Sequence, residues 1–382
     1  MRSSPTRRAS RSLTALVLQG GGALGAYQGG AFEAMAAAGR QPDWLAGISI
    51  GAVNAALIAG NPPERRVQQV REFWRRVTAT VPSPEWAGPG GPLRAWANDL
   101  AAAWGSAFGL PSFFLPRPCA SLWPCEGDAP SLYDTSPLRE TLRELVDFDR
   151  VNDGPTRLSV GAVDVQSGNF VYFDSREQRL GPEHVMASGA LPPGFPAVTI
   201  GGRVYWDGGL VSNTPLRHVV EHLGGADATV FQVDLFSARG PVPRTLSQVA
   251  DREKDIQFSS RTRAISDLLR ERHEMRRRLR ELVALLPADR RRDPRIADAL
   301  AGLRAGEREP AITLVHIIHR HKGSETQTRD YEFSRASMRE HWEAGRADMA
   351  RSLRALLMAP SAATPGAFRV LDCTAPDNRH FR

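Results

Sequence analysis

A serine between two glycines is the residue of this chain whose neighbours best suit a nucleophile. Ser49 lies in "GISIG", with Gly47 and Gly51 two positions to either side, after an apolar run and before a helix-like run. A strand-to-helix turn at this serine would expose its hydroxyl at the top of a sheet, at the positive end of a helix dipole. The pattern alone occurs by chance in about one chain in ten of this length, so its place at a predicted strand end gives it weight.

A glycine-rich segment, "QGGGALG", also lies between a predicted strand and a predicted helix. Successive amides of such a loop can converge on an anion, as in the oxyanion hole of an acyl-transfer enzyme. The alternative is dinucleotide binding, because Gly20, Gly22 and Gly25 fit G-x-G-x-x-G. That motif needs an acid at the end of the second strand. Here Asp43 precedes that strand and Ser49 ends it, which favours the oxyanion hole.

The base that would take the serine proton is not an obvious histidine. None of the nine histidines lies in a loop that is built to present it. A single strand precedes the one that Ser49 ends, whereas several strands precede the nucleophile of α/β-hydrolases. Asp207, in "YWDGGL", ends a predicted strand directly before Gly208 and Gly209. Alone it would be a plain Asp-Gly turn. Together with the serine and the glycine loop it is the leading candidate for the base.

In this order, "GGGALG", "GISIG" and "DGG" resemble the oxyanion loop, nucleophile elbow and acidic motif of the patatin-like phospholipase family. "ASGALPPGFP" (187–196) is similar to a segment that this family carries shortly before its aspartate. The resemblance covers residues 13–236. It implies a Ser–Asp dyad without a histidine, with Ser49 as the nucleophile and Asp207 as the base.

The resemblance also implies the remaining parts of the site and the substrate. The amides of Gly21 to Ala23 would form the oxyanion hole, within a loop that comprises Gly20, Gly21, Gly22, Ala23 and Gly25. Many relatives carry a basic residue where this chain has Leu24, so a preference for phospholipids stays open. The expected substrate is a lipid ester, with no metal and no organic cofactor. The alternatives are a catalytically silent scaffold or regulator of the same fold and a dinucleotide-binding protein.

The alternation of elements over residues 13–60 predicts an α/β fold with parallel strands. The resemblance specifies a three-layer patatin-like fold, in which a mainly parallel central sheet is flanked by helices, followed by a mostly helical C-terminal extension. The expected parts are a disordered basic arm (1–12), the catalytic domain (13–236) and the extension (237–382).

Residues 75–135 form an insertion rich in proline, glycine and aromatic residues. It contains Trp86, Trp96, Trp104, Phe108, Phe113, Phe114 and Trp123. Two interpretations stay open: a lid beside a lipid-binding cleft, or a hydrophobic cluster packed under a long loop.

The extension begins with an apolar stripe at helical spacing. Its members are Ile265, Leu268, Met275, Leu279, Leu282 and Leu286. They predict an amphipathic helix that buries this stripe and exposes its arginines. A solvated arginine face is favoured over one that lies on anionic lipid.

Charge and apolar runs bear on partners and location. The net charge of +7 is diffuse, which leaves peripheral contact with an anionic membrane open; no nucleic-acid module is recognised, so no nucleic-acid partner is expected. The N-terminal apolar run is too short for a signal peptide and no run suits a membrane span, so we expect a cytoplasmic protein. Cys119, Cys125 and Cys373 are expected to be free thiols, with a Cys119–Cys125 disulfide as the alternative. The oligomeric state is not predicted.

Overall fold

The structure of the protein is a computed structural model. It describes residues 12–83, 85–88, 90–117, 131–291, 293–299, 309–320, 325–359 and 366–372. Three predictions concern residues outside these ranges. They are the basic arm, of which only Ser12 is described, Trp123 of the insertion, and the three cysteines.

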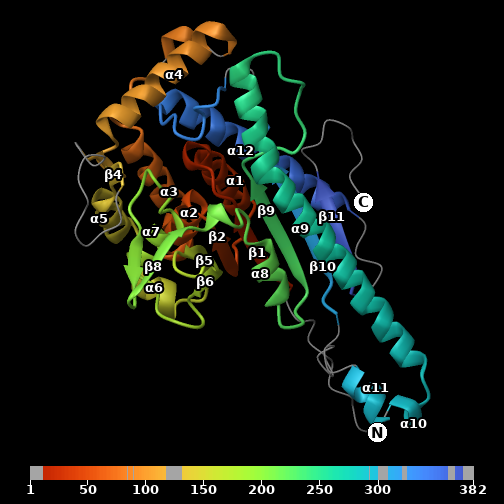
Figure 1. Ribbon diagram of the computed structural model, residues 1–382. Coiled ribbons are helices and arrows are strands. Elements are labelled where there is room, and N and C mark those ends of the chain that lie inside the picture. Colours follow the sequence, from red (N-terminus) through yellow and green to blue (C-terminus); the bar gives the residue numbers. More distant parts are fainter. Residues whose placement is uncertain are drawn as a thin grey trace.

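A nine-stranded sheet forms the centre of the molecule (Figure 1), with the strand order β11-β10-β9-β1-β2-β5-β8-β7 and β6 paired to β5. The parallel strands are β1 (Leu13–Leu18), β2 (Trp44–Gly47), β5 (Arg157–Asp164), β9 (Ala228–Asp234), β10 (Ile312–Ile318) and β11 (Phe368–Asp372). The antiparallel strands are β6 (Phe170–Asp174), β7 (Val198–Ile200) and β8 (Arg203–Asp207). The predicted, mainly parallel sheet is confirmed.

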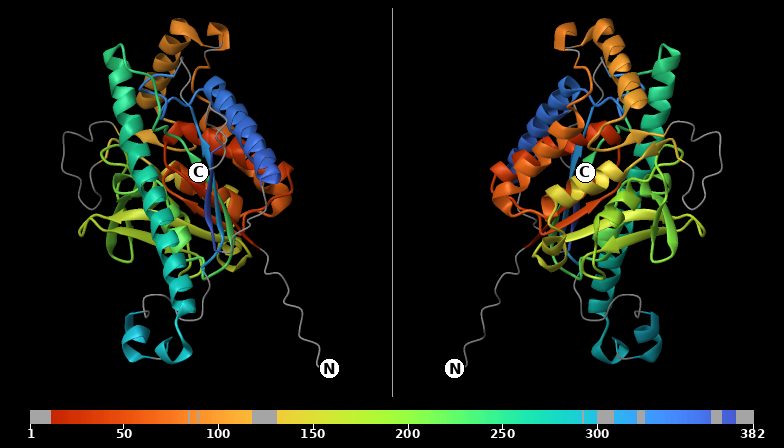
Figure 2. Two further views of the ribbon diagram at one scale, coloured as in Figure 1. Left: turned by 90° about the vertical axis from the view of Figure 1, so that its right-hand side faces the viewer. Right: turned by 90° about the vertical axis from the view of Figure 1, so that its left-hand side faces the viewer.

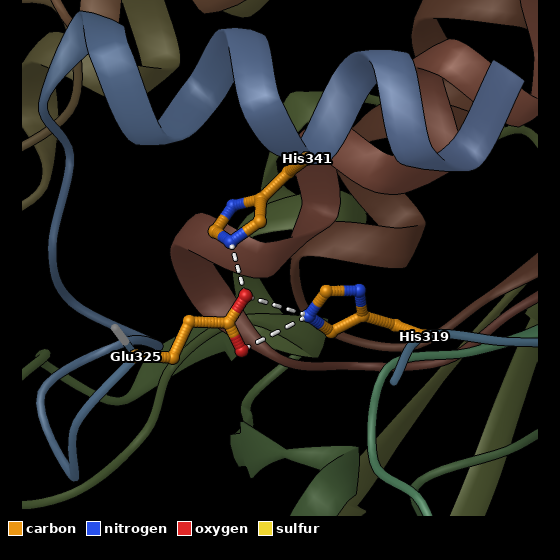
Figure 3. Close-up of side chains that lie close together, drawn as sticks. All are labelled: His319, Glu325 and His341. Carbon is orange, nitrogen blue, oxygen red and sulfur yellow. Dashed lines mark hydrogen bonds and ion pairs between the residues drawn. The ribbon is translucent and has the colours of Figure 1, made fainter. Parts of the chain in front are cut away.

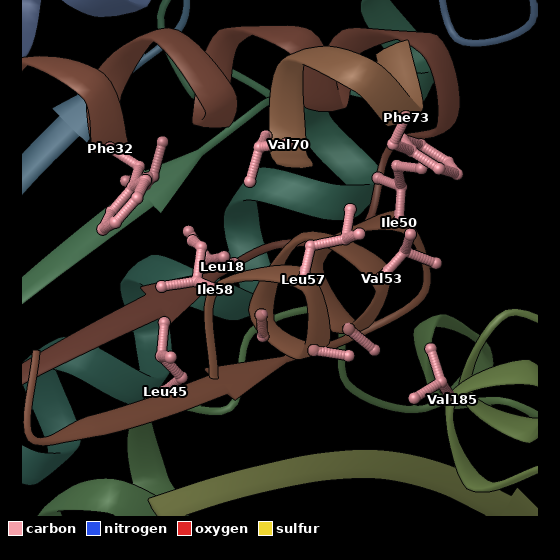
Figure 4. Packing of buried hydrophobic residues seen from close by; sticks show 14 of the residues in the cluster. Leu18, Phe32, Leu45, Ile50, Val53, Leu57, Ile58, Val70, Phe73 and Val185 are labelled. Carbon is pink, nitrogen blue, oxygen red and sulfur yellow. The ribbon is translucent and has the colours of Figure 1, made fainter. Parts of the chain in front are cut away.

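Helices cover both faces of the sheet and complete three layers (Figure 2). Successive residues of a strand point to opposite faces, and β1 divides in this way: Leu16 and Leu18 pack in one hydrophobic cluster, Ala15 and Val17 in another. The first cluster (Figure 4) lies under α1 (Ala26–Ala37), α2 (Ile50–Ala59), α3 (Pro63–Val77) and α12 (Arg335–Met358). The second lies under α8 (Leu216–Glu221) and α9 (Leu246–Leu285). The predicted three-layer fold class is confirmed.

The smaller elements connect these layers. They are β3 (Leu115–Pro116), β4 (Tyr133–Asp134), α4 (Gly91–Phe108), α5 (Ser136–Leu145), α6 (Phe148–Asp153), α7 (Pro182–Ser188), α10 (Ala288–Arg291) and α11 (Pro294–Ala299). None of the helices in the described part of the chain combines the length and the apolar character needed to cross a bilayer.

The C-terminal region continues the central sheet. β10 pairs with β9 in parallel over its whole length, and β11 adds a further parallel strand. The helix α12 lies so close to α1 that a Cβ on Gly30 would come within 1.8 Å of the Trp342 carbonyl oxygen. Helices dominate the region after residue 236, as predicted, and its strands join the same sheet and core as residues 13–236.

The aromatic insertion divides into two parts. Phe113 and Phe114 are buried; the Phe113 ring meets Phe195 edge-on, and the Phe114 ring lies tilted against it. The helix α4 instead exposes the apolar side chains of Leu93, Trp96, Leu100, Trp104 and Phe108, each 43–60% exposed. Phe113 and Phe114 therefore belong to an ordinary hydrophobic cluster, whereas α4 has an apolar face that the described chain does not cover.

The long helix α9 corrects the predicted stripe. It begins at Leu246, well before the stripe, and extends beyond the body of the molecule (Figure 1). Leu268, Met275 and Leu282 are 60–70% exposed, whereas Leu269 is buried against the sheet. The 3.6-residue period identified a helix, but of the predicted stripe only Ile265 packs against the second hydrophobic cluster, beside Leu269.

Candidate functional site

Ser49 occupies a tight turn between β2 and α2. Its backbone has φ 54° and ψ −124°, and it is the only described non-glycine residue with a positive φ. Such strain, worth about 1–3 kcal/mol, is characteristic of functional sites. A Cβ on Gly47 would lie 2.3 Å from the Gly51 carbonyl oxygen, so glycine is needed where the strand and helix cross. The arrangement has the form of the predicted nucleophile elbow.

Ser188, at the end of α7, holds the elbow in place. The Ser49 amide donates to both the carbonyl oxygen (3.1 Å) and Oγ (3.0 Å) of Ser188. The Ser188 hydroxyl in turn donates to the Gly161 carbonyl on β5 at 2.6 Å. Our sequence reasoning gave Ser188 no role, although it lies in the "ASGALPPGFP" segment that carried part of the resemblance.

The register of β5 brings Asp207 to the level of Ser49. β6 pairs with one edge of β5, so β2 and β8 share the other edge. Gly47, the last residue of β2, pairs with Val160, and Asp207 pairs with Ala162, two residues further along. Ser49 lies two residues beyond Gly47. Strand pairing therefore juxtaposes two residues that are far apart in the sequence.

The Asp207 carboxyl is buried, with 2% of the residue exposed. Its Oδ1 accepts a hydrogen bond from the Gly209 amide at 2.7 Å, and the Ser49 hydroxyl also hydrogen-bonds the carboxyl. Burial raises the pKa of Asp207 to about 6, although both hydrogen bonds favour the charged form. Among the described residues, neither a cation nor a histidine pairs with this carboxyl. The group is therefore suited to exchange a proton with Ser49 near neutral pH.

The glycine loop lies beside the elbow, since a Cβ on Gly20 would come within 3.1 Å of the Ser49 Cβ. The Gly20 amide donates to the Asn213 carbonyl (3.3 Å), and the Ala23 amide donates to the Asp330 carbonyl (2.7 Å). Within the described chain, the amides of Gly21 and Gly22 have no backbone acceptor.

These bonds correct the expected oxyanion hole. Ala23 cannot offer its amide while it donates to Asp330, and Gly25 lies further along the loop, packed against Ile50. The candidate donors are thus reduced to Gly21 and Gly22.

Asn213 links the glycine loop to the loop that follows Asp207. Its side-chain amide donates to the Gly20 carbonyl oxygen at 3.0 Å, and it is buried. Gly208, in the same loop, lies so close to β5 that a Cβ would be 2.6 Å from the Gly161 carbonyl oxygen. Asn213 was also missed, because an asparagine six residues after Asp207 has no distinctive sequence signal.

The geometry disfavours the dinucleotide alternative. The Asp43 carboxylate accepts a hydrogen bond from the Thr14 amide at 2.8 Å, at the start of β1 and β2. It therefore lies at the opposite end of these strands from the glycine loop. β2 ends in the Ser49 elbow, so it presents no acid to a ribose.

Known proteins resemble the chain in both halves. A family model described as patatin-like phospholipase matches residues 16–220, more than half of the chain, and one described as patatin phospholipase matches residues 256–359. No curated protein sequence matches the chain. The crystal structure of VipD from Legionella pneumophila is similar at 13% identity, with a TM-score of 0.38, over 90% of this chain and 67% of that one. The match over residues 16–220 shows that this chain belongs to the patatin-like phospholipase family of lipid acyl hydrolases.

Proposed function

We propose that this protein hydrolyses carboxylic esters of lipids through a dyad of Ser49 and Asp207. The observation that carries the proposal is the buried Asp207 carboxyl, with a pKa of about 6, hydrogen-bonded to the serine of a strained elbow. A carboxylate with this pKa can accept a proton at neutral pH and return it within the same reaction.

In the acylation step, Ser49 Oγ attacks the ester carbonyl carbon as its proton passes to the Asp207 carboxylate. The carbonyl oxygen becomes an oxyanion, which the Gly21 and Gly22 amides stabilise. The C–O bond to the alcohol then breaks, and Asp207 gives its proton to the departing oxygen. The acyl group remains on Ser49 as an ester.

In the deacylation step, Asp207 takes a proton from water, and the resulting hydroxide attacks the acyl carbon. Collapse of the second oxyanion breaks the bond to Ser49 Oγ, which recovers the proton from Asp207. The products are a fatty acid and the free enzyme. The scheme has no step that involves a metal ion, a redox cofactor or a histidine.

We further propose a cytoplasmic protein that contacts membranes peripherally through the exposed apolar face of α4. Trp96 and Trp104 on this face suit the interface between headgroups and acyl chains. Sedimentation with lipid vesicles tests this: Trp96→Asp with Trp104→Asp should abolish binding, and unchanged binding would contradict it.

A panel of lipid substrates tests the activity itself. Purified protein would be given a diacyl phospholipid, a lysophospholipid, a triacylglycerol and an acyl thioester, with fatty acid release measured by mass spectrometry. Release should disappear in Ser49→Ala. It should persist in Ser352→Ala, a matched control whose buried hydroxyl has no hydrogen-bond partner among the described residues. Folded wild-type protein that cleaves none of them would support the scaffold alternative, and NADH binding by fluorescence would support the nucleotide alternative.

A further inference from the structure

Two histidines and a glutamate converge in the interior, in a cluster that the proposed reaction does not use. His319 directly follows β10, Glu325 belongs to the segment before α12, and His341 lies on α12. Figure 3 shows both imidazole rings directed at the Glu325 carboxylate. We call these three residues the His-Glu-His cluster.

The spacing of the three side chains matches that of metal ligands. Nε2 of His319 lies 3.2 Å from Glu325 Oε1 and 3.3 Å from Oε2, and Nε2 of His341 lies 3.2 Å from Oε1. One ligand atom from each residue lies within 4.8 Å of the others. Bonds of about 2.0–2.1 Å to a tetrahedral Zn²⁺ separate neighbouring ligand atoms by roughly 3.3 Å. A small inward shift would therefore place all three around one ion.

The cluster is buried, and its second nitrogens are unused. The three side chains are only 3–6% exposed. Nδ1 of His319 and Nδ1 of His341 are both buried without a hydrogen-bond partner in the described structure. The Nε2 atoms of both rings thus meet at the Glu325 carboxylate. A cation at this place would bind both imidazoles and the carboxylate.

Nearby charges permit a cation at this place. Arg329 is a cation that acts electrostatically on His319, and Asp255 (2.6 Å) and Asp251 (3.7 Å) neutralise it. Two imidazoles and one carboxylate form a borderline nitrogen and oxygen ligand set, which selects Zn²⁺ and neighbouring transition metals over Ca²⁺ or Mg²⁺.

We propose that His319, Glu325 and His341 bind one divalent transition-metal ion, with Zn²⁺ as the first choice. The chain supplies three ligands, and water completes a four-coordinate site. This inference goes beyond the proposed ester hydrolysis and does not depend on it.

The ion would fasten the segment that reaches the glycine loop. Five residues after Glu325, the Asp330 carbonyl accepts the Ala23 amide at 2.7 Å, while its carboxylate pairs with Lys254 of α9 at 2.7 Å. Between them, Thr328 donates to Asp99 of α4 at 2.8 Å. The metal would thus join the end of β10, the helix α12 and this segment at one point.

Metal analysis of the full-length protein tests the proposal. Untagged protein is stripped with a chelator, loaded with Zn²⁺, dialysed and assayed by atomic mass spectrometry, in wild type, Glu325→Gln and His341→Gln. The matched control is His273→Gln, another buried histidine, whose Nε2 contacts the Gly366 carbonyl oxygen outside the cluster. Wild type and control should retain one Zn²⁺ per chain, and both cluster variants should bind at least about tenfold more weakly.

A second measurement does not rely on variants that must fold. Co²⁺ added to stripped wild-type protein should give the strong visible absorption of a four-coordinate site, and Zn²⁺ should abolish it. Zn²⁺ should also slow amide hydrogen exchange in residues 325–333. Folded wild type without stoichiometric Zn²⁺ or Co²⁺ binding would overturn the proposal, as would undiminished binding by Glu325→Gln. Ser49→Ala should bind Zn²⁺ like wild type, so failure of the hydrolase proposal would be separately visible.

Discussion

Asp207 and Glu325 are both buried carboxyls, yet their partners differ in kind. Asp207 receives hydrogen bonds from a backbone amide and a hydroxyl, and burial outweighs them and raises its pKa to about 6. Burial alone would also raise the pKa of Glu325, but its interaction with His319 and the hydrogen bonds from His319 and His341 hold it well below its ordinary value. Burial lowers the pKa of His319 itself, so we ascribe the effect chiefly to the hydrogen bonds. Neutral donors leave a buried carboxyl able to exchange protons, whereas imidazoles keep it ionised. The first suits a base, and the geometry around the second suits a metal ligand.

If Asp207 is the base and Glu325 is not, the largest loss of ester hydrolysis should come from Asp207→Asn. An amide cannot accept the Ser49 proton, so kcat/KM should fall by about 10³- to 10⁴-fold, measured on the best ester substrate. Asp234→Asn is the matched control, since burial also raises the pKa of Asp234, to about 7, and Gln232 is its partner. The control should keep its activity. A histidine variant as damaging as Asp207→Asn would point to a triad instead.

A smaller loss should follow from Ser188→Ala, which removes one acceptor of the Ser49 amide and leaves the Gly161 carbonyl without its donor. We expect kcat to fall by about 10- to 100-fold, because a slightly displaced nucleophile is costly, and KM to change little. Since Ser188 acts only by positioning Ser49, the pH profile should keep its shape. A shifted profile would mean that Ser188 takes part in proton transfer.

The pH dependence should report the environment of Asp207. The protonated carboxyl cannot accept a proton, so kcat/KM should fall about tenfold per pH unit below a pKa near 6 and level off above it. Steady-state rates with a soluble ester between about pH 4.5 and 8 would show this. A plateau that extends to pH 4.5 would mean that Asp207 has an ordinary pKa and is not the base.

The smallest effect on hydrolysis should come from Glu325→Gln. It should lower the free energy of unfolding by about 1–3 kcal/mol, because two buried imidazoles lose their ionised partner, and leave kcat/KM within about tenfold. Urea unfolding in the presence of Zn²⁺ and ester assays would measure the two quantities. If Glu325→Gln lost as much hydrolysis as Asp207→Asn, both carboxyls would be needed for catalysis, and the distinction between them would be wrong.

Much of the candidate site could be read from the sequence because its parts are short and local. The glycines around Ser49 are required by contacts within one turn, and Asp207 stands beside two glycines at a strand end. The roles of Ser188 and Asn213 could not be read, since each depends on which distant carbonyl or amide it meets. The Ala23 amide is a similar case. It donates to the Asp330 carbonyl and so cannot stabilise an oxyanion, and the two residues are more than 300 positions apart in the chain.

The C-terminal region shows the same limit in the fold. The apolar run of residues 311–319 is typical of a buried strand, but its pairing with β9 depends on tertiary packing. Residues 319, 325 and 341 have no recognisable metal-ligand spacing in the sequence. The cluster forms only because the fold brings together the end of β10, the segment before α12 and α12 itself. Packing also chose Leu269 over most of the predicted stripe on α9.

Reaction with a fluorophosphonate probe, followed by peptide mapping, tests most directly whether Ser49 is activated by Asp207. Wild-type protein and Asp207→Asn would be labelled side by side, with circular dichroism to establish that both are folded. We predict a single labelled site at Ser49 and a sharp loss of labelling in the variant. Labelling of another serine, or equal labelling of Ser49 in both proteins, would contradict the dyad.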